Sequence, residues 1–336
     1  MGLTVAVTGP TGEVGRPLLV ALEREDAVET VRGMARRAFD PAAHGFSKVH
    51  HQRGDVLDRE AVARLVEGAD VVVHLAFAIF GSREETRRVN LEGTRNVFEA
   101  ARDAGASRLV YTSSVAAYGF HTDNPQPLGE EVPARGSEDF YYSAQKAELE
   151  GMLARTLEGS GTEAHVFRPC IVAGRHAIKL VEHAVAQVGV GYRLPLVREA
   201  MRSLSILRPV LPEWGVRFQL VHHDDVASAL AAATAGRGRP GAYNLAGDGE
   251  ITLADLARAL EWHSVRVPAS AVGALASAAA RLPLRPIEVE WVNAFRVPVI
   301  VDTSKARSEL GWIPLYDALE TLLETVEGGR AEGLLG

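Results

Sequence analysis

The chain has 336 residues, enough for one large or two modest domains with a substantial core. Hydrophobic residues make up 47% and charged residues 24%, which is ordinary for a soluble globular protein. The net charge of −7, with no run of Lys or Arg, gives no reason to expect nucleic acid or an anionic membrane as a partner. The single cysteine, Cys170, excludes an internal disulfide and metal sites built on several cysteines.

The N-terminus enters an apolar strand at once, without a basic segment followed by a long apolar run. We therefore expect no secretory signal and a cytoplasmic protein. The longest alanine-rich apolar stretch, residues 269–284, contains Arg281 and Pro283 and is too short to span a membrane. The expected partner is a small-molecule substrate.

Residues 3–8 form a short apolar run that predicts a strand, and residues 17–22 have helical character. Between them Gly9, Gly12 and Gly15 follow the spacing G-x-x-G-x-x-G. A strand, a glycine-rich turn and a helix in this order predict a nucleotide site, because glycines let backbone N–H groups approach a pyrophosphate at the helix N-terminus. The alternative is a turn with a purely structural role.

The second strand is predicted at residues 30–35 and ends in Arg36 and Arg37, with no acid before Asp40. At this place an acid contacts the ribose 2′-hydroxyl of NAD, whereas an arginine accommodates the 2′-phosphate of NADP. The sequence therefore favours NADP, and otherwise NAD. Two solvated arginines at the end of a strand are the alternative.

Apolar runs and helical segments then alternate. Strands are predicted at residues 48–54, 70–76, 108–114 and 163–169, and helices at residues 59–67, 84–104 and 140–158. This alternation predicts an α/β fold with a Rossmann-like, doubly wound parallel sheet, whose ligands bind at the carboxyl ends of the strands. Asp55 lies at such an end, where it either contacts an adenine edge or caps the next turn.

Tyr142 and Lys146 are separated by one helical turn in the helix predicted at residues 140–158. A free tyrosine is a poor acid or base at neutral pH, but a lysine ammonium beside it favours the phenolate and prepares it for proton transfer. Only Tyr142, and not the neighbouring Tyr141, has this spacing to Lys146. The alternative is two surface residues one turn apart.

The alternation loosens after residue 174. A strand is predicted at residues 216–221, followed by His222, His223, Asp224 and Asp225. Neighbouring residues of an extended segment point to opposite faces, and H-E-x-x-H is absent, so we expect no metal site there. Asp224 or Asp225 is expected to cap the next helix. Cys170 is expected to be a packed core thiol.

Further on, a capped helix is predicted at residues 252–262, and apolar helical walls are predicted at residues 271–282. We expect a dinucleotide-binding domain at residues 1–174, to which residues 216–246 return. Residues 175–215 and 247–336 are expected to form a smaller, mostly helical substrate-binding lobe.

Taken together, these motifs resemble those of the extended short-chain dehydrogenase/reductase superfamily, in the NAD-dependent epimerase/dehydratase family. The resembling segments run along nearly the whole chain: residues 8–15, 54–56, 74–76, 90–94, 111–114, 118–119, 142–146, 168–169, 302–306 and 310–312. Jointly they are specific for the family and weakly specific for any one member.

The resemblance implies roles for individual residues. Tyr142 would be the acid/base, Lys146 would bind the nicotinamide ribose and lower the tyrosine pKa, and Ser114 would hydrogen-bond the substrate oxygen. The remaining cofactor contacts would come from the turn and from the strand ends: Gly9, Thr11, Gly12, Glu13, Val14, Gly15, Arg36, Arg37, Asp55, Val56, Leu75, Ala76, Arg168, Pro169 and Ile171.

The chain departs from the family pattern at two places that bear on its reaction. Dehydratases of the family have Thr-Asp-Glu where this chain has Ser113-Ser114-Val115, which disfavours dehydration. Sugar-nucleotide epimerases often keep an arginine where this chain has Phe218, and Arg217 lies one residue off, which weighs against a nucleoside-diphosphate sugar.

Three functions follow as hypotheses. The first is a reductase or dehydrogenase that uses NADP(H) on the carbonyl or hydroxyl carbon of a small molecule. The second is a sugar-nucleotide epimerase that keeps one NAD bound and recycles it. The third is an NADP-sensing regulator without chemistry, which ranks last because such relatives usually lose the Tyr/Lys pair. Family resemblance also suggests a homodimer formed through the helices at residues 91–104 and 141–156.

Overall fold

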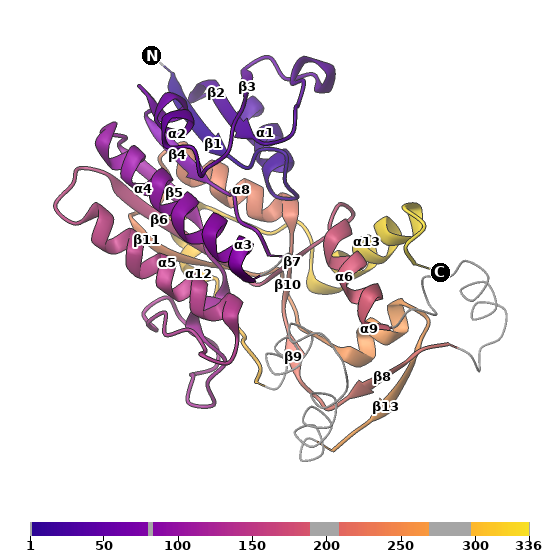
Figure 1. The fold of residues 1–336 in the computed structure, drawn as a ribbon. Helices are drawn as coiled ribbons and strands as arrows, with labels where there is room; N and C mark the ends of the chain where they lie inside the picture. The colour runs from indigo at the N-terminus through magenta and orange to yellow at the C-terminus, as the bar shows by residue number, and fades with distance from the viewer. Residues whose placement is uncertain (1, 80–82, 189–207, 269–296, 336) are drawn as a thin grey trace.

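The computed structural model describes residues 2–79, 83–188, 208–268 and 297–335. Its main feature is a seven-stranded parallel sheet in the order β11-β6-β5-β4-β1-β2-β3 (Figure 1). The strands are β1 (Leu3–Thr8), β2 (Val28–Ala35), β3 (Val49–Arg53), β4 (Val71–His74), β5 (Arg108–Thr112), β6 (Glu163–Pro169) and β11 (Gly241–Leu245). The predicted Rossmann-like sheet is confirmed, and the strand order reverses between β1 and β4.

The central strands are buried on both faces, which explains their nearly continuous apolar sequences. Val5 and Val7 of β1 belong to the core on one face, whereas Ala6 between them belongs to the core on the other. Thr8 pairs in register with His74 at the ends of β1 and β4. The polar side chains at the carboxyl ends of these strands therefore lie together at one edge of the sheet.

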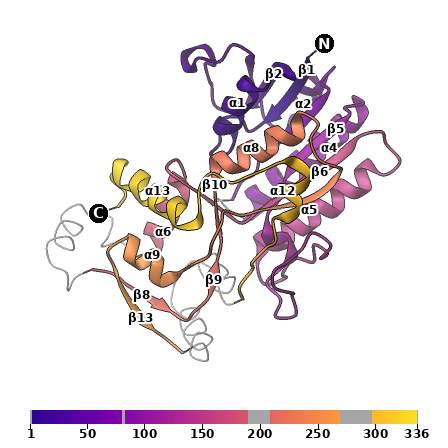
Figure 2. The same ribbon diagram turned by 180° about the vertical axis from the view of Figure 1, so that it is seen from behind.

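Helices cover both faces of the sheet. One layer contains α1 (Gly15–Arg24), α8 (His223–Thr234) and α12 (Ser304–Leu310), which lie on the near face in Figure 2. The other contains α2 (Arg59–Val66), α4 (Thr94–Asp103) and α5 (Tyr141–Leu157). The sheet is thus the middle of three layers, as expected for doubly wound folds.

The helix predicted at residues 84–104 has an irregular centre. It begins as α3 (Arg83–Arg87), passes through a π-helical segment at Arg88–Gly93 and continues as α4. Single π-helical turns inside α-helices occur frequently at functional sites. Here the segment carries Asn90, which contacts the candidate active site.

A smaller lobe lies beside the carboxyl edge of the sheet (Figure 1). Its described helices are α6 (Ile178–Val188), α9 (Leu253–Ala259) and α13 (Ala318–Ala331). Thr252 and Asp255 form a capping box at α9, which confirms the capped helix predicted there. The helical walls predicted at residues 271–282 lie outside the described residues.

Short strand pairs add to these helices; the strand predicted at residues 216–221 is divided between two of them, and the others were not predicted. β8 (Val210–Glu213) pairs with β13 (His263–Arg266), and β9 (Arg217–Phe218) pairs with β12 (Ile251–Thr252). β7 (Ile171–Ala173) pairs with β10 (Leu220–His222) close to the end of β6.

Later parts of the chain return to the main sheet. Strand β11 forms its edge beside β6, and α8 packs against α1. Val299, Val301 and Trp312 belong to the same apolar core as Val5 and Leu230. Residues from the start, middle and end of the chain therefore share one core. Among the described helices, none is both long and apolar enough to cross a membrane.

Candidate active site

The glycine-rich turn lies between β1 and α1 and is shaped by close backbone approaches. Gly9 has a φ of +73°, and a Cβ there would lie 2.9 Å from the backbone nitrogen of Ala76. A Cβ at Gly15 would lie 2.3 Å from the carbonyl oxygen of Gly9. No side chain caps the first turn of α1. The turn therefore offers backbone N–H groups that no side chain caps, at the N-terminus of α1, which fits the pyrophosphate of a dinucleotide.

Other residues predicted to bind the cofactor lie at the adjoining strand ends. Leu75 and Ala76 follow β4, and Ala76 is the residue that Gly9 approaches. Asp55 and Val56 follow β3; the Asp55 carboxylate accepts a hydrogen bond of 3.0 Å from the backbone of Leu57. The turn and these strand ends lie together at one edge of the sheet, whereas their contacts with a cofactor stay predictions.

Within the turn, Thr11 and Val14 are partly buried, and Glu13 reaches the lobe. Its carboxylate accepts a hydrogen bond of 3.3 Å from the backbone of Lys179 in α6. Burial raises the pKa of Glu13, while Lys179 opposes that shift.

Arg36 and Arg37 follow β2 and are exposed. Their backbone carbonyls accept hydrogen bonds from Arg53 and His51, at 3.1 Å in each case. Within the described ranges, neither guanidinium forms a hydrogen bond or an ion pair. Both cations are therefore available to an anionic group beside β2.

Ser114, Tyr142 and Lys146 are brought together by β5 and α5. Ser114 follows β5 and caps a short 3₁₀ helix, where its hydroxyl accepts a hydrogen bond of 3.1 Å from the backbone of Ala116. The Tyr142 hydroxyl hydrogen-bonds the side chain of Ser114. Lys146 lies one turn after Tyr142 and donates a hydrogen bond of 3.0 Å to the carbonyl oxygen of Thr112. A hydroxyl pair with a cation nearby is suited to moving a proton to or from a substrate oxygen.

The protonation of Tyr142 and Lys146 is governed by burial. Burial raises the pKa of Tyr142, and the hydrogen bond with Ser114 opposes the rise. Lys146 is only 3% exposed, and burial lowers its pKa to about 7, although Glu150 opposes the fall. The ammonium nitrogen lies 3.7 Å from the ring centroid of Phe77. Burial therefore raises the pKa of Tyr142, whereas the resemblance implied that Lys146 lowers it.

Replacing Lys146 with methionine is expected to stabilise the protein while impairing turnover. Below about pH 7 the buried ammonium penalises the folded state, and this penalty shrinks as the pH rises from the folded pKa toward the ordinary lysine value. At pH 6 we expect Lys146→Met to raise the free energy of unfolding by about 1–3 kcal/mol, and by less at pH 9, in urea titrations.

Lys305 provides the matched control for that variant. It also donates to a backbone carbonyl, at 2.7 Å, and lies 4.4 Å from a tyrosine ring centroid, but its side chain is only partly buried. Lys305→Met should bring no gain in stability. A Lys146→Met variant less stable than the wild type at pH 6 would contradict the buried-charge argument.

Asn90 and Gln145 connect the π-helical segment to α5. The Asn90 amide accepts a hydrogen bond of 2.8 Å from the backbone nitrogen of Ala78 and donates one of 2.9 Å to its carbonyl oxygen. It also donates a bond of 3.1 Å to the side chain of Gln145. These bonds position the segment after β4 beside the helix that carries Tyr142 and Lys146. Asn90 lies in one of the segments that resemble the family, residues 90–94, but the sequence alone assigns it no part in positioning this helix.

A buried ion pair lies on the far side of Lys146. Glu150 binds Arg168 through two hydrogen bonds of 2.6 and 3.1 Å, and the two side chains are 10% and 7% exposed. Ser113 donates a hydrogen bond of 2.6 Å to the same carboxylate. The Arg168 guanidinium also lies 4.4 Å from the ring centroid of Tyr118. The positive charge of Arg168 is thus neutralised by Glu150 within the protein. Contacts of Arg168, Pro169 and Ile171 with a nicotinamide stay a prediction.

Sequence reasoning missed the role of Glu150. The signal was its position four residues after Lys146, on the same face of α5.

His74 forms a second buried network under the glycine-rich turn. Its ring nitrogens hydrogen-bond the hydroxyls of Thr8 and Thr94, at 2.6 and 2.9 Å. Burial, with a smaller contribution from Lys146, lowers the pKa of His74 to about 3. The histidine is therefore a neutral link between β1, β4 and α4. Cys170 is buried, which raises the pKa of its thiol and agrees with a packed core residue.

The capping prediction for α8 is wrong. His222, and not Asp224 or Asp225, is the capping residue, and its ring accepts a hydrogen bond of 3.3 Å from the backbone of Asp224. The Asp225 carboxylate instead accepts hydrogen bonds from the backbones of Leu315 and Tyr316, at 2.8 and 3.2 Å. The helix begins two residues earlier than a cap at Asp224 requires.

The sequence profile described as the NAD dependent epimerase/dehydratase family matches residues 5–246. This range contains the glycine-rich turn, Ser114, Tyr142 and Lys146. The uncharacterized protein y4nG of Sinorhizobium fredii is 29% identical over 332 residues, which cover 96% of this chain and 77% of the relative. The uronate dehydrogenase of Pseudomonas syringae pv. tomato is 30% identical over 158 residues, 47% of this chain and 55% of the relative.

Solved structures share the fold across the whole chain. The crystal structure of gox2253 has a TM-score of 0.76 and 24% identity, with 100% of both chains covered. MoeE5, in complex with UDP-glucuronic acid and NAD, has a TM-score of 0.69 and 18% identity, with 98% of this chain and 100% of the other covered.

Proposed function

The chain belongs to the NAD-dependent epimerase/dehydratase family of the extended short-chain dehydrogenase/reductases, and we propose that it is an NADP-preferring oxidoreductase. Its substrate would be a small molecule that is reduced at a carbonyl carbon or oxidised at a hydroxyl carbon. The observation that carries this proposal is the arrangement of Ser114, Tyr142 and Lys146: the two hydroxyls are bonded to each other, and the buried Lys146 nitrogen lies 5.9 Å from the ring centroid of Tyr142.

Each of the three residues has a separate task in this proposal. The Tyr142 hydroxyl gives a proton to the substrate oxygen during reduction and takes it back during oxidation. Ser114 holds that oxygen within reach by a hydrogen bond, and Lys146 supplies positive charge when protonated. A bound nicotinamide dinucleotide supplies the hydride chemistry. Gly9, Thr11, Gly12, Glu13, Val14 and Gly15 would hold its pyrophosphate, with Asp55, Val56, Leu75 and Ala76 at the adenine and ribose side.

The preference for NADP is supported by the exposed guanidinium groups of Arg36 and Arg37 after β2. Arginine pairs with phosphate through parallel, charge-assisted hydrogen bonds, and the second strand of such folds ends beside the adenosine ribose.

Oxidation or reduction is favoured over dehydration by the residues around Ser114. Ser113 is bonded to Glu150, and Val115 is buried, so the segment offers no acid pair to expel a hydroxyl. The similarity to a uronate dehydrogenase over 47% of the chain agrees with a dehydrogenase and suggests sugar acids as a first substrate class to assay.

The second candidate is a sugar-nucleotide epimerase that retains NAD. It is supported by the shared fold of MoeE5, described in complex with UDP-glucuronic acid and NAD. Arg217 weighs against it, because its guanidinium forms an ion pair of 2.9 Å with Glu250 and is thereby engaged within the protein.

The two candidates differ in what the purified protein carries. We expect an acid-denatured sample to release little dinucleotide by mass spectrometry, and the emptied protein to bind NADPH more tightly than NADH. Near-stoichiometric NAD⁺ in the released fraction would instead favour the epimerase and contradict the role of Arg36.

Arg36→Asp then tests the cofactor preference directly. Loss of a charge-assisted phosphate contact is expected to weaken NADPH binding about 10- to 100-fold, with little effect on NADH, in fluorescence titrations. Arg64→Asp makes the same charge change on α2, where the side chain is exposed and paired with Glu60, and should leave both affinities unchanged.

A further inference from the structure

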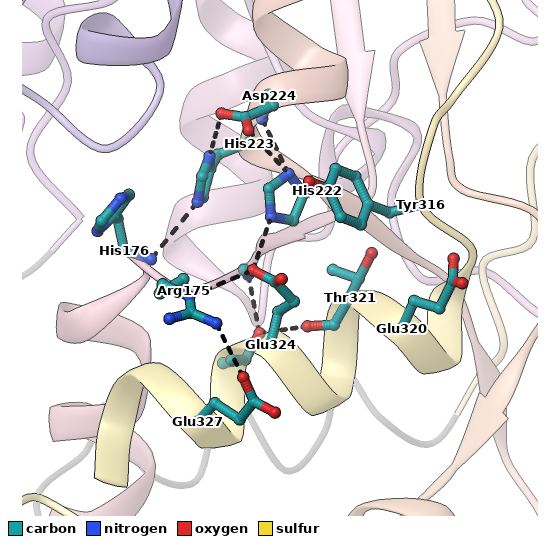
Figure 3. Close-up of polar contacts among 12 residues, drawn as sticks. Arg175, His176, His222, His223, Asp224, Tyr316, Glu320, Thr321, Glu324 and Glu327 are labelled. Carbon is teal, nitrogen blue, oxygen red and sulfur yellow. Dashed lines mark hydrogen bonds and ion pairs between the residues drawn. The ribbon is translucent and has the colours of Figure 1, made fainter. Parts of the chain in front are cut away.

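Three imidazoles and a carboxylate gather at the start of α8, next to α13 of the lobe (Figure 3). His222 ends β10 and His223 begins α8, so the two residues do not share an extended backbone. Their rings lie 4.1 Å apart between centroids. The sequence predicts no metal site here on the assumption that neighbouring side chains point to opposite faces of an extended segment. That assumption is wrong for His222 and His223.

Asp224 completes a compact set of potential ligands. Its carboxylate lies 2.9 Å from Nδ1 of His223 and 3.7 Å from Nδ1 of His222. One atom from each of the three residues lies within 4.8 Å of the others. Zinc binds imidazole nitrogen and carboxylate oxygen at about 2.0–2.2 Å, so these side chains would have to rotate: the His223–Asp224 separation would lengthen and the longer separations would shorten.

Nε2 of His222 lies on the side of the ring away from Nδ1, the nitrogen that faces Asp224. His222 is 1% exposed, yet this nitrogen has no hydrogen-bond partner among the described residues. It points toward the Glu324 carboxylate of α13, at 3.8 Å (Figure 3). A histidine that binds a metal through one nitrogen commonly directs its other N–H to a carboxylate, which is the arrangement Glu324 provides after a slight approach.

His176 brings a third imidazole from a different segment. Its exposed ring stacks on His223 with 5.4 Å between centroids, and its backbone N–H donates a hydrogen bond of 3.4 Å to Nε2 of His223. Nδ1 of His223, which is bonded to Asp224, is therefore the nitrogen that would bind the ion. A rotation of the His176 side chain would add a fourth protein ligand.

Packing and capping explain only part of this arrangement. The ring of His222 stacks on Tyr316 at 3.9 Å between centroids and caps α8 through Nδ1. An ion bound through Nδ1 would replace this cap, and the N–H then carried by Nε2 would face Glu324.

We propose that His222, His223 and Asp224 bind one divalent transition-metal ion of the zinc type, with His176 as the fourth ligand and Glu324 bonded to His222. Imidazole and carboxylate ligands suit Zn²⁺, whereas Mg²⁺ and Ca²⁺ prefer oxygen ligands alone. The ion joins three segments: the one between β7 and α6, the start of α8, and, through Glu324, α13. Its role is structural, because these residues are separate from Ser114, Tyr142 and Lys146.

The test is metal binding by the full chain, prepared without a polyhistidine tag and treated with a chelator. We expect isothermal titration with Zn²⁺ to give one ion per chain, and Co²⁺ to develop the strong visible absorption of a tetrahedral site. Zn²⁺, but not Mg²⁺, should raise the melting temperature. His223→Ala and Asp224→Asn should each weaken Zn²⁺ binding at least about 10-fold, and Glu324→Gln should weaken it about 10- to 100-fold.

His50→Ala is the matched control, because it removes an exposed imidazole on β3 outside the cluster and should bind as the wild type does. Circular dichroism establishes whether each variant is folded. If His223→Ala unfolds, the Zn²⁺ affinity of Asp224→Asn tests the proposal instead, because the Asp224 side chain is 48% exposed and its replacement should not disturb the fold. The proposal is overturned if the wild type binds no stoichiometric Zn²⁺, or if Asp224→Asn and folded His223→Ala bind it as tightly as His50→Ala.

Discussion

Replacing Tyr142 with phenylalanine is expected to lower turnover by about 10²- to 10⁴-fold while dinucleotide affinity stays near that of the wild type. The change removes only the hydroxyl that is bonded to Ser114, and therefore the proton donor and acceptor, while the ring keeps its edge contact with Phe77. Steady-state oxidation or reduction of whichever compound the wild type accepts, together with NADPH titration, separates the loss of chemistry from a loss of binding.

Tyr141 is the natural control for this experiment. It precedes Tyr142 on the same helix, and its hydroxyl donates to the backbone carbonyl of Arg83 and accepts from Gln145, both at 2.9 Å. Tyr141→Phe should change turnover by only a few fold. If the two variants had equal activity, the proposed role of Tyr142 would be wrong.

Replacing Glu150 with glutamine is expected to lower the free energy of unfolding by about 3–5 kcal/mol. The variant keeps the shape of the side chain but leaves the charge of Arg168 buried without a counterion, because both side chains are nearly enclosed. Since Glu150 opposes the lowering of the Lys146 pKa, this pKa should fall further. Urea unfolding measures the first effect, and the pH profile of turnover measures the second.

Glu148→Gln is the comparison, two residues earlier on the same helix. Glu148 pairs with Arg87 at 3.6 Å, and the two side chains are 43% and 55% exposed. An exposed pair contributes about 0–1 kcal/mol, so this variant should retain nearly all of its stability. Equal losses in the two variants would falsify the claim that burial makes the Glu150–Arg168 pair important.

The sheet and the glycine-rich turn could be predicted because their signals are local. Val71, Val72 and Val73 are apolar because their strand is buried on both faces, and the glycines of the turn occur where backbone segments approach too closely for a Cβ. Tyr142 and Lys146 were visible for the same reason, since helical periodicity alone brings them to one face.

The supporting polar contacts could not be predicted, because they join residues far apart in the sequence. Arg168 meets Glu150 only after β6 has paired with β5 and α5 has packed on the sheet. Asn90 reaches Ala78 through a helix whose π-helical turn has no obvious local signal. The placement of the two neighbouring histidines could not be predicted for a different reason. A strand ends at His222 and a helix begins at His223, and the exact boundaries of elements are the least reliable part of sequence-based prediction.

The shared core of early and late residues has a consequence for how the chain matures. Strand β11 completes the edge of the sheet only at residues 241–245, and Trp312 enters the core beside Val5 much later still. During synthesis, the first six strands emerge with an unpaired edge at β6 and with apolar surface that α8 and α12 later cover. The core of the nucleotide-binding unit is therefore complete only after residue 312 has been synthesised, and until then the unpaired edge and the uncovered apolar surface favour aggregation.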